Sequence, residues 1–312
     1  MNRTASLAGL ALGVVMLLAA GCSSADTGGE LASSSPGSGG TTPASAGPSS
    51  ATGSASAGQV PAPAHTVVVV MENHAYSEVI GTSAAPFLNQ LARQGAVFTH
   101  SYAITHPSQP NYLALFSGST QGVVGDSCPV ELTAPNLAAE LIAAGKTFTG
   151  YSEDLPATGS ETCSSGDYAR RHVPWTDFRN VPGSVNQPFS SFPAADFSLL
   201  PTVSFVIPNL CNDMHDCNVA TGDSWLQTHI GGYARWAMTH DSLLIITWDE
   251  DDGSQSNQIP TIFAGQLVRP GTYTEPITHY SVLATLEAAY GLPRAGDRTA
   301  QAQPPIANIW RS

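Results

Sequence analysis

Two apolar runs, each followed directly by acidic residues, constrain this chain more than any other feature. The first run comprises residues 67–71 and precedes Glu72, Asn73 and His74. The second comprises residues 243–248 and precedes four acidic residues, Asp249 to Asp252. Continuous runs of this type are typical of strands buried on both faces of a parallel sheet, and ligands bind at the carboxyl ends of such strands. Both runs therefore predict oxygen ligands at the active-site edge of an α/β fold.

Further apolar patterns alternate between strand and helix along the chain. Strands are expected at residues 66–70, 97–102, 147–151, 203–207, 243–247 and 261–264, and helices at residues 85–94, 136–144, 223–239 and 281–290. This alternation predicts a three-layer α/β/α sandwich with a mainly parallel central sheet. Residues 153–195 are rich in Pro, Ser and Gly and are expected to form a long functional excursion. Residues 64–312 are expected to form one catalytic domain because no internal linker or repeat divides them.

The N-terminal composition indicates export. Residues 1–21 are expected to be a signal peptide, because a short apolar stretch ends in small residues. Residues 18–22 resemble a lipoprotein box, which predicts lipidation of Cys22, with ordinary cleavage and release as the alternative. Residues 22–63 are mainly Ser, Gly, Ala, Thr and Pro and are expected to form a disordered tether. The chain is thus predicted to be a cell-surface lipoprotein anchored at Cys22, or a secreted protein.

The charge and the cysteines limit the partners further. The formal net charge is −13, and no basic stripe is present, which argues against nucleic acid as a partner. Four of the five cysteines remain when Cys22 is set aside, and an even number in an exported chain suggests disulfides. Three pairings are formally possible, and proximity in the sequence favours Cys128 with Cys163 and Cys211 with Cys217.

Ser108 is the candidate nucleophile. Pro110 suits the first turn of a helix, which would place Ser108 just before a helix N-terminus. One interpretation is that Ser108 only caps this helix. The other is that its hydroxyl attacks a phosphate attracted by the helix-start amides, for which it needs a base or a metal.

The two acidic strand ends could supply that metal. Hard oxygen ligands suit one divalent cation of unknown identity, and Ser108 or a phosphate oxygen could complete its shell. The ligands expected are Glu72, Asn73, Asp249 and Glu250. The alternative is that acidic residues after a strand merely begin solvated loops.

A third segment, residues 208–217, follows another strand and carries Asp213 and His215. His215 is a candidate acid or phosphate contact, although a lone histidine is more often structural. Asp223 is a further candidate or only a helix cap. His279, before the last helix, is ambiguous in the same way.

Several motifs in this order resemble a phosphoesterase family that joins bacterial acid phosphatases with phospholipases C, within the alkaline-phosphatase-like superfamily. The resemblance covers residues 64–310 and rests on residues 71–74 (Met-Glu-Asn-His), 106–112 (His-Pro-Ser-Gln-Pro-Asn-Tyr), 168–175, 212–216 (Asn-Asp-Met-His-Asp) and 247–253. It implies an alkaline-phosphatase-like fold. Other stretches, such as residues 113–118 and 201–209, resemble the secreted members that act on phosphatidylinositol 3-phosphate, which implies a phosphomonoesterase more than a diesterase.

The resemblance also implies roles for single residues. Ser108 matches the nucleophile, while Glu72, Asn73, Asp249 and Glu250 match the metal site. His106 and His215 match histidines that line the phosphate pocket, with Asp213 and His279 beside them. Two departures stand out: residues 257–260 read Asn-Gln-Ile-Pro where many members have Asp-His-Val-Pro, and the Cys211 and Cys217 pair is additional to the secreted members.

The function expected is therefore hydrolysis of phosphomonoesters, either small molecules or phosphoinositides, by a monomer. A membrane would take part only through a lipid anchor or a lipid substrate. The mechanism expected is an in-line attack by Ser108, with Asn73 and helix amides holding the phosphate and His215 protonating the leaving group. One alternative is a phospholipase C-type diesterase, for which the excursion could offer an apolar surface through Trp175, Phe178, Phe189 and Phe192. A less favoured alternative is a non-enzymatic, cation-binding surface lipoprotein.

Overall fold

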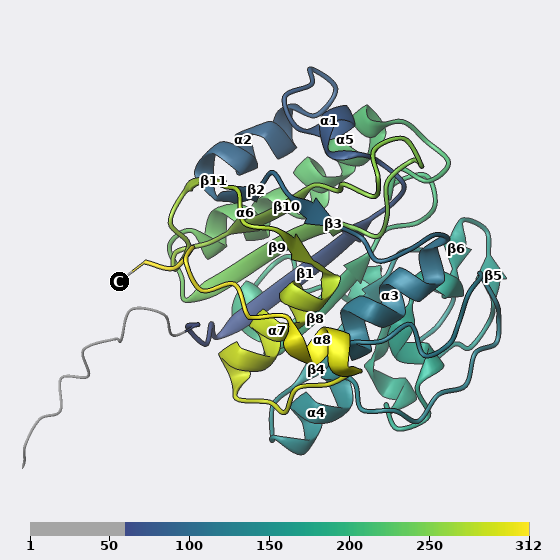
Figure 1. Cartoon of the computed structure of the whole chain (residues 1–312). Coiled ribbons are helices and arrows are strands. Elements are labelled where there is room, and N and C mark those ends of the chain that lie inside the picture. Colours follow the sequence, from purple (N-terminus) through teal and green to yellow (C-terminus); the bar gives the residue numbers. More distant parts are fainter. Residues whose placement is uncertain (1–59, 312) are drawn as a thin grey trace, which may run out of the picture. The chain divides into compact units, whose positions relative to one another are not determined.

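An eight-stranded sheet lies at the centre of the computed structural model, which describes residues 60–311 (Figure 1). The expected signal peptide, Cys22 and most of the expected tether lie outside these residues. The strand order is β11-β2-β10-β9-β1-β8-β4-β7. The strands are β1 His65–Met71, β2 Ala96–Phe98, β4 Phe148–Ser152, β7 Asn186–Pro188, β8 Val203–Ile207, β9 Ser242–Trp248, β10 Thr261–Ala264 and β11 Gly271–Tyr273. All neighbours pair in parallel except β10, which is antiparallel to both β9 and β2.

Helices cover both faces of the sheet and confirm the three-layer α/β/α architecture (Figure 1). Alternate residues of β1 enter two different cores, with Val68 and Val70 on one face and Val67, Val69 and Met71 on the other. The first core includes residues of α3, α4 and α7, and the second includes residues of α2, α5 and α6. The helices are α1 Tyr76–Val79, α2 Pro86–Gln94, α3 Ser108–Ser117, α4 Leu137–Ala143, α5 Val219–His229, α6 Gly231–Ala237, α7 His279–Tyr290 and α8 Arg298–Ala302.

Two expected elements are interrupted in the structure. The strand expected at residues 97–102 leaves the main sheet after β2, and its second part, β3 (Ser101–Tyr102), pairs in parallel with β12 (Ile277–Thr278). The helix expected at residues 223–239 starts earlier, as α5, and stops at His229 before α6 begins at Gly231. Gly231 and Gly232 follow the break, and glycine disfavours helix interiors by about 1 kcal/mol relative to alanine.

The excursion at residues 153–195 packs against the domain instead of forming an apolar surface. It contains edge strand β7, a small hairpin of β5 (Ser164–Ser165) and β6 (Tyr168–Ala169), and several 3-10 turns: η1 Arg170–His172, η2 Pro174–Asp177, η3 Gly183–Val185 and η4 Phe189–Ser191. A further turn, η5 Phe197–Leu199, follows it. Trp175, Phe178 and Phe192 are buried in the two cores, and Phe189 is partly buried against one of them. The aromatic surface considered for acyl chains is therefore not formed by these residues.

Two disulfides join the expected cysteines. Cys128 pairs with Cys163, which ties the loop after α3 to the excursion, and Cys211 pairs with Cys217 within one short loop. Both pairings agree with the sequence-based prediction, and both fit an exported chain. Within residues 60–311, no helix is long and apolar enough to span a bilayer.

The sheet order places the acidic loops side by side. Strand β1 lies between β9 and β8, and all three run in parallel. The segments after these strands therefore meet at one edge. Two backbone hydrogen bonds link them: Glu72 N donates to Asp213 O (2.9 Å), and Asp249 N donates to Met71 O (2.9 Å).

Candidate active site

Glu72 lies at the centre of the site, directly after β1, and its side chain is fully buried. Its two carboxylate oxygens have different neighbours. Oε2 accepts a hydrogen bond from Ser108 Oγ at 3.2 Å. Oε1 accepts one from the Tyr112 hydroxyl, one turn further along the same helix. The end of β1 and the start of α3 are therefore joined through a single carboxylate.

Ser108 is the first residue of α3 and is buried. Pro107 is the N-cap residue and offers no side-chain cap, so α3 is capped from outside: Asp126 Oδ1 accepts a hydrogen bond from Gln109 N at 3.0 Å. Ser108 is therefore not the N-cap residue of α3, and its hydroxyl faces Glu72. The helix start also offers fewer free amides than expected, since Gln109 N is engaged and Pro110 has no N–H.

Asn73 and Asp249 form a second link across the strand ends. Asn73 adopts a left-handed backbone conformation (φ 49°), which asparagine tolerates better than most residues. The backbone amide of Asn73 donates to Asp249 Oδ1 at 3.1 Å. Asn73 Oδ1 and Asp249 Oδ2 are both buried and have no hydrogen-bond partner. Buried oxygens without a donor need another positive partner, and these two, next to Glu72, suit a divalent cation.

The pKa values of the buried carboxylates also indicate that the cluster suits a cation. Burial raises the pKa of Glu72 well above its ordinary value, and the nearby charges of Asp249 and Asp213 raise it further. Burial and then the charge of Glu250 raise the pKa of Asp249. Burial is also the main cause that raises the pKa of Glu250 to about 8. A cation between these carboxylates would relieve both their mutual repulsion and the cost of their desolvation.

Glu250 and His106 meet at the more open side of the cluster. Glu250 Oε2 lies 3.1 Å from His106 Nδ1, and it also accepts from Asn111 Nδ2 at 3.1 Å. His106 Nε2 lies 3.2 Å from Asp251 Oδ1. The Asp251 carboxylate also accepts amides of its own loop, from Gly253 to Asn257, so Asp251 shapes this loop. The His106 side chain is 45% exposed and thus lies where a substrate can reach it.

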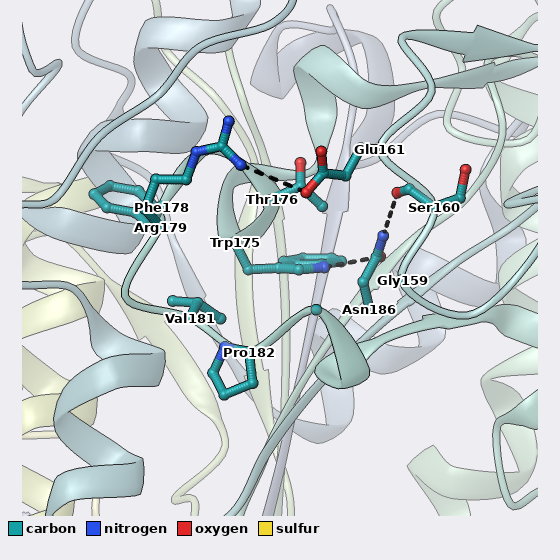
Figure 2. Close-up of a pocket in the computed structure, with 11 residues that line it drawn as sticks. Gly159, Ser160, Glu161, Trp175, Thr176, Phe178, Arg179, Val181, Pro182 and Asn186 are labelled. Atoms are coloured by element: carbon teal, nitrogen blue, oxygen red, sulfur yellow. Dashed lines mark hydrogen bonds and ion pairs between the residues drawn. The ribbon is translucent and has the colours of Figure 1, made fainter.

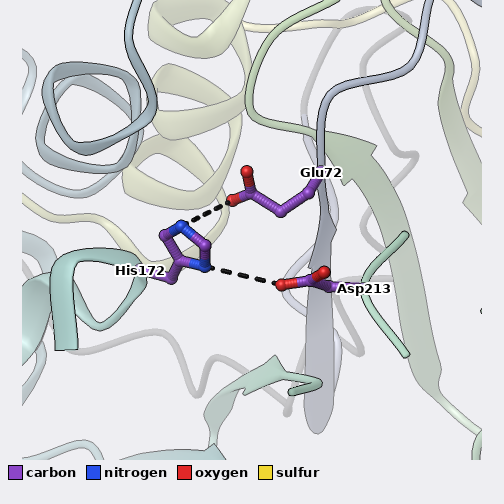
Figure 3. A group of neighbouring side chains, drawn as sticks. All are labelled: Glu72, His172 and Asp213. Carbon is purple, nitrogen blue, oxygen red and sulfur yellow. Dashed lines mark ion pairs between the residues drawn. The ribbon is translucent and has the colours of Figure 1, made fainter. Parts of the chain in front are cut away.

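His172 occupies a position that the sequence did not assign to any role. It lies fully buried between two carboxylates, with Nε2 3.4 Å from Glu72 Oε1 and Nδ1 3.5 Å from Asp213 Oδ2 (Figure 3). Its ring stacks on Tyr112 at a centroid distance of 5.1 Å. One ligand atom from each of Glu72, His172 and Asp213 lies within 4.8 Å of the others, so this group could also hold a metal ion.

The signal for His172 was present in the Arg-Arg-His run of residues 170–172, within one of the family-like motifs. The spacing of that run gave no reason to place it beside the strand ends. Arg171, from the same run, extends an Nη2 that lies 3.4 Å from His215 Nε2. His215 Nδ1 lies 2.7 Å from Asp216 Oδ1, and the His215 side chain is 27% exposed. Arg171 and His215 thus line the outer side of the cluster.

Asp213 and His279 lie against the cluster, whereas Asp223 does not. Asp213 is buried, its Oδ1 accepts from His215 N at 2.8 Å, and burial raises its pKa to about 8. His279 Nε2 donates to Asp249 O at 2.7 Å, and burial lowers the pKa of His279 to about 4. His279 therefore positions the second strand end as a neutral ring. Asp223 instead caps α2, accepting from the amides of Phe87 and Leu88 at 3.0 and 2.8 Å.

A separate cavity of about 130 Å³ opens within the excursion and involves none of the candidate residues (Figure 2). Trp175 forms part of its wall, and the indole Nε1 donates to Asn186 Oδ1 at 2.9 Å. Arg179 and Glu161 form an ion pair at its rim (3.6 Å). The indole of Trp175 and the charges of Arg179 and Glu161 are thus paired within the excursion, and we assign no function to this cavity.

Comparisons with known proteins identify the family of this chain. The model of the Phosphoesterase family matches residues 82–293. The phosphatidylinositol-3-phosphatase of Mycobacterium tuberculosis is 56% identical over 80% of this chain and 84% of its own length. An acid phosphatase of Aspergillus fumigatus is 32% identical over 73% of this chain, which spans 55% of that relative. A solved structure from Vibrio parahaemolyticus, described as a protein of the alkaline phosphatase superfamily, shares the fold with a TM-score of 0.54 at 13% identity, covering 75% of this chain and 69% of the other.

Proposed function

The chain belongs to the Phosphoesterase family, and we propose that it is an exported acid phosphatase that hydrolyses phosphomonoesters through a phosphoserine at Ser108. The observation that carries the proposal is the position of the Ser108 hydroxyl. It lies at a helix start and donates to Glu72 Oε2 at 3.2 Å, beside the second acidic strand end. A capping serine would not need this environment, whereas a nucleophile that attacks an anion does.

In the first step, Ser108 Oγ forms a bond to phosphorus as the ester oxygen departs on the opposite side. Glu72 Oε2 orients the hydroxyl and is proposed to take its proton. The Asn73 side chain and the Ser108 amide are proposed to hold the non-bridging oxygens. Water then breaks the phosphorus–Oγ bond of the phosphoserine and releases inorganic phosphate.

His215 is proposed to give the leaving oxygen its proton. Its ring lies on the outer side of the cluster, with Nδ1 2.7 Å from Asp216 Oδ1 and Nε2 3.4 Å from Arg171 Nη2. His106, with both ring nitrogens facing carboxylates, is proposed to line the phosphate pocket and to keep Glu250 and Asp251 in register. Each of these groups acts by position and charge, which is how phosphoryl transfer is generally accelerated.

The buried carboxylates fit one divalent cation of unknown identity. Such a cation would lower the pKa of the Ser108 hydroxyl and offset the charge of the phosphate. The proposed ligands are Glu72, Asn73, Ser108, Asp249 and Glu250, and the unpartnered oxygens of Asn73 and Asp249 support this set most directly. His172 and Asp213 adjoin it through Glu72 and are an alternative place for the cation.

The substrate is proposed to be a phosphomonoester, with phosphoinositides among the first to be tested. The support is the 56% identity to the mycobacterial relative, a phosphatidylinositol-3-phosphatase. Export is supported by the two disulfides, and lipidation at Cys22 stays a prediction from the sequence. No contact in residues 60–311 specifically favours a diester substrate.

The test is the replacement Ser108→Ala, with Ser117→Ala as the matched control. Both serines lie buried on α3, but the Ser117 hydroxyl donates only to main-chain oxygens, at 2.8 Å for Leu113 O. We expect Ser108→Ala to reduce phosphate release from 4-nitrophenyl phosphate by at least about 10⁴-fold, as for other nucleophiles, while the circular dichroism spectrum is unchanged. Retained turnover in a folded Ser108→Ala protein would exclude the nucleophile assignment.

A further inference from the structure

Arg171 is an arginine at the outer side of the candidate site. Arg171 Nη2 lies 3.4 Å from His215 Nε2, and within residues 60–311 no other arginine or lysine side chain forms a hydrogen bond or ion pair with a candidate catalytic or metal-site residue. The neighbouring Arg170 is turned inward. Its guanidinium donates to Glu161 O and Thr176 O, both at 2.8 Å, and it is buried. Arg170 is therefore a structural residue, and Arg171 alone can offer charge to a ligand.

The Arg171 guanidinium is held loosely. Its Nε is buried and has no hydrogen-bond partner, although Asp126 Oδ2 lies 3.8 Å away, which is an ion pair beyond hydrogen-bond distance. The side chain as a whole is 28% exposed, so it borders both solvent and the cluster. A buried donor without an acceptor is uncommon in a folded protein and calls for a partner. A phosphate accepts two parallel bonds from the planar fork of a guanidinium.

Asp126 lies between this guanidinium and the helix turn that carries Ser108. The other oxygen of the same carboxylate, Oδ1, accepts from Gln109 N in the first turn of α3. Gln109 in turn donates its side-chain amide to buried Asp177 (3.1 Å) and accepts from Ser127 N (2.7 Å). The loop that carries Asp126 is thus bound to the helix turn that carries the nucleophile, and the same carboxylate forms the 3.8 Å ion pair with Arg171.

We propose that Arg171 binds the outer non-bridging oxygens of the substrate phosphate and thereby selects monoesters over diesters, with Asp126 as its positioning residue. The inference deepens the proposed function and rests on it. A fully ionised monoester has three non-bridging oxygens and two charges, whereas a diester has two such oxygens and one charge. A diester must also place its second substituent on one side of the phosphate. It therefore gains less from a guanidinium there, so the benefit from Arg171 is specific to the monoester.

The test compares Arg171→Gln with the wild-type protein on two substrates that share one leaving group, 4-nitrophenyl phosphate and bis(4-nitrophenyl) phosphate. We expect kcat/KM to fall about 100-fold for the monoester and less than about threefold for the diester, because two charge-assisted hydrogen bonds are lost only with the monoester. Arg171→Lys should recover part of the loss, since it keeps the charge but not the fork. Arg179→Gln is the matched control, because Arg179 lies on the same excursion and pairs only with Glu131 and Glu161.

Equal losses on both substrates, or no loss on either, would overturn the role of Arg171. Inorganic phosphate gives a readout that does not depend on turnover. Its inhibition or dissociation constant should rise about tenfold or more in Arg171→Gln, and an unchanged constant would also overturn the inference. The proposed function fails in a different way, namely if wild-type protein hydrolyses the diester faster than the monoester or if Ser108→Ala keeps full activity.

Discussion

Replacing Asp249 by asparagine should have opposite effects on the stability of the protein with and without a cation. Asp249 is fully buried, its Oδ1 accepts from Asn73 N, and its Oδ2 has no partner. Asparagine keeps an oxygen for the Asn73 amide and removes a charge that repels Glu72 and Glu250. Without a cation, Asp249→Asn should therefore unfold at the same temperature as the wild type or a higher one. With a cation, it should lose the stabilisation that the wild type gains.

The size of that gain follows from linkage. A cation at about 100 times its dissociation constant stabilises the folded state by about 2.7 kcal/mol. In a domain of roughly 250 residues, each kcal/mol shifts the melting temperature by about 2–4 °C. We therefore expect the wild-type melting temperature to rise by about 5–10 °C when the cation is added after chelation. Asp249→Asn should show little or none of this rise, and its phosphatase activity should fall together with its affinity for the cation.

The assay is differential scanning calorimetry at pH 8, after chelation and then in a titration with Mg²⁺, Ca²⁺, Mn²⁺ or Zn²⁺. Asp252→Asn is the matched control. The Asp252 carboxylate is exposed and accepts only from Ser254 of its own loop, so this variant should respond to cations as the wild type does. The reasoning is refuted if metal-free Asp249→Asn is clearly less stable than the metal-free wild type, or if both proteins gain equally from the cation.

Two further predictions concern groups next to the cluster and remote from it. Tyr112→Phe removes the hydroxyl that donates to Glu72 Oε1. In the presence of chelator, its free energy of unfolding, measured with urea, should be lower by about 1–3 kcal/mol. An unchanged midpoint would mean that this bond contributes nothing. Burial, followed by the charge of Glu287, raises the pKa of Glu140 to about 7. Because this folded-state pKa lies above the unfolded value, the Glu140 carboxylate destabilises the fold fully above pH 7 and not at all below about pH 4.5. Glu140→Gln should therefore raise the melting temperature at pH 8 and leave it unchanged at pH 4. The control is Glu131→Gln, at an exposed glutamate, which should not shift this pH dependence. A rise of equal size at both pH values in Glu140→Gln would contradict the assignment.

The central part of the fold could be predicted from the sequence because its signals are local. Strands β1 and β9 are buried on both faces, so their residues are continuously apolar, and the acidic residues that follow them mark the strand ends. Parallel pairing of adjacent strands then brings Glu72 and Asp249 together without further information. Ser108 could be placed at a helix start for the same reason, since Pro110 marks a first turn. The disulfide pairing followed from proximity in the chain.

The remainder of the site depends on contacts that no local pattern encodes. His172 and Arg171 belong to a short 3-10 turn in an irregular excursion, and only the packing of that excursion brings them to Glu72, Asp213 and His215. Asp126 caps α3 from a loop that shows no helical signal. Asp223 was expected to be a site residue or only a helix cap. It caps α2, a helix far from it in the sequence. The antiparallel direction of β10 is likewise set by its pairing partners and not by its own residues.

The most direct test of the central claim is to look for the covalent intermediate. The protein is mixed with an excess of 4-nitrophenyl phosphate, quenched in acid during turnover and digested, and the peptide that contains Ser108 is examined by mass spectrometry, with Ser108→Ala as the blank. A two-step displacement predicts phosphate on Ser108 in the wild type, lost on a chase without substrate at a rate no slower than turnover. An active enzyme whose rapidly quenched Ser108 peptide is never phosphorylated, and whose phosphate release inverts the configuration at phosphorus, would contradict it.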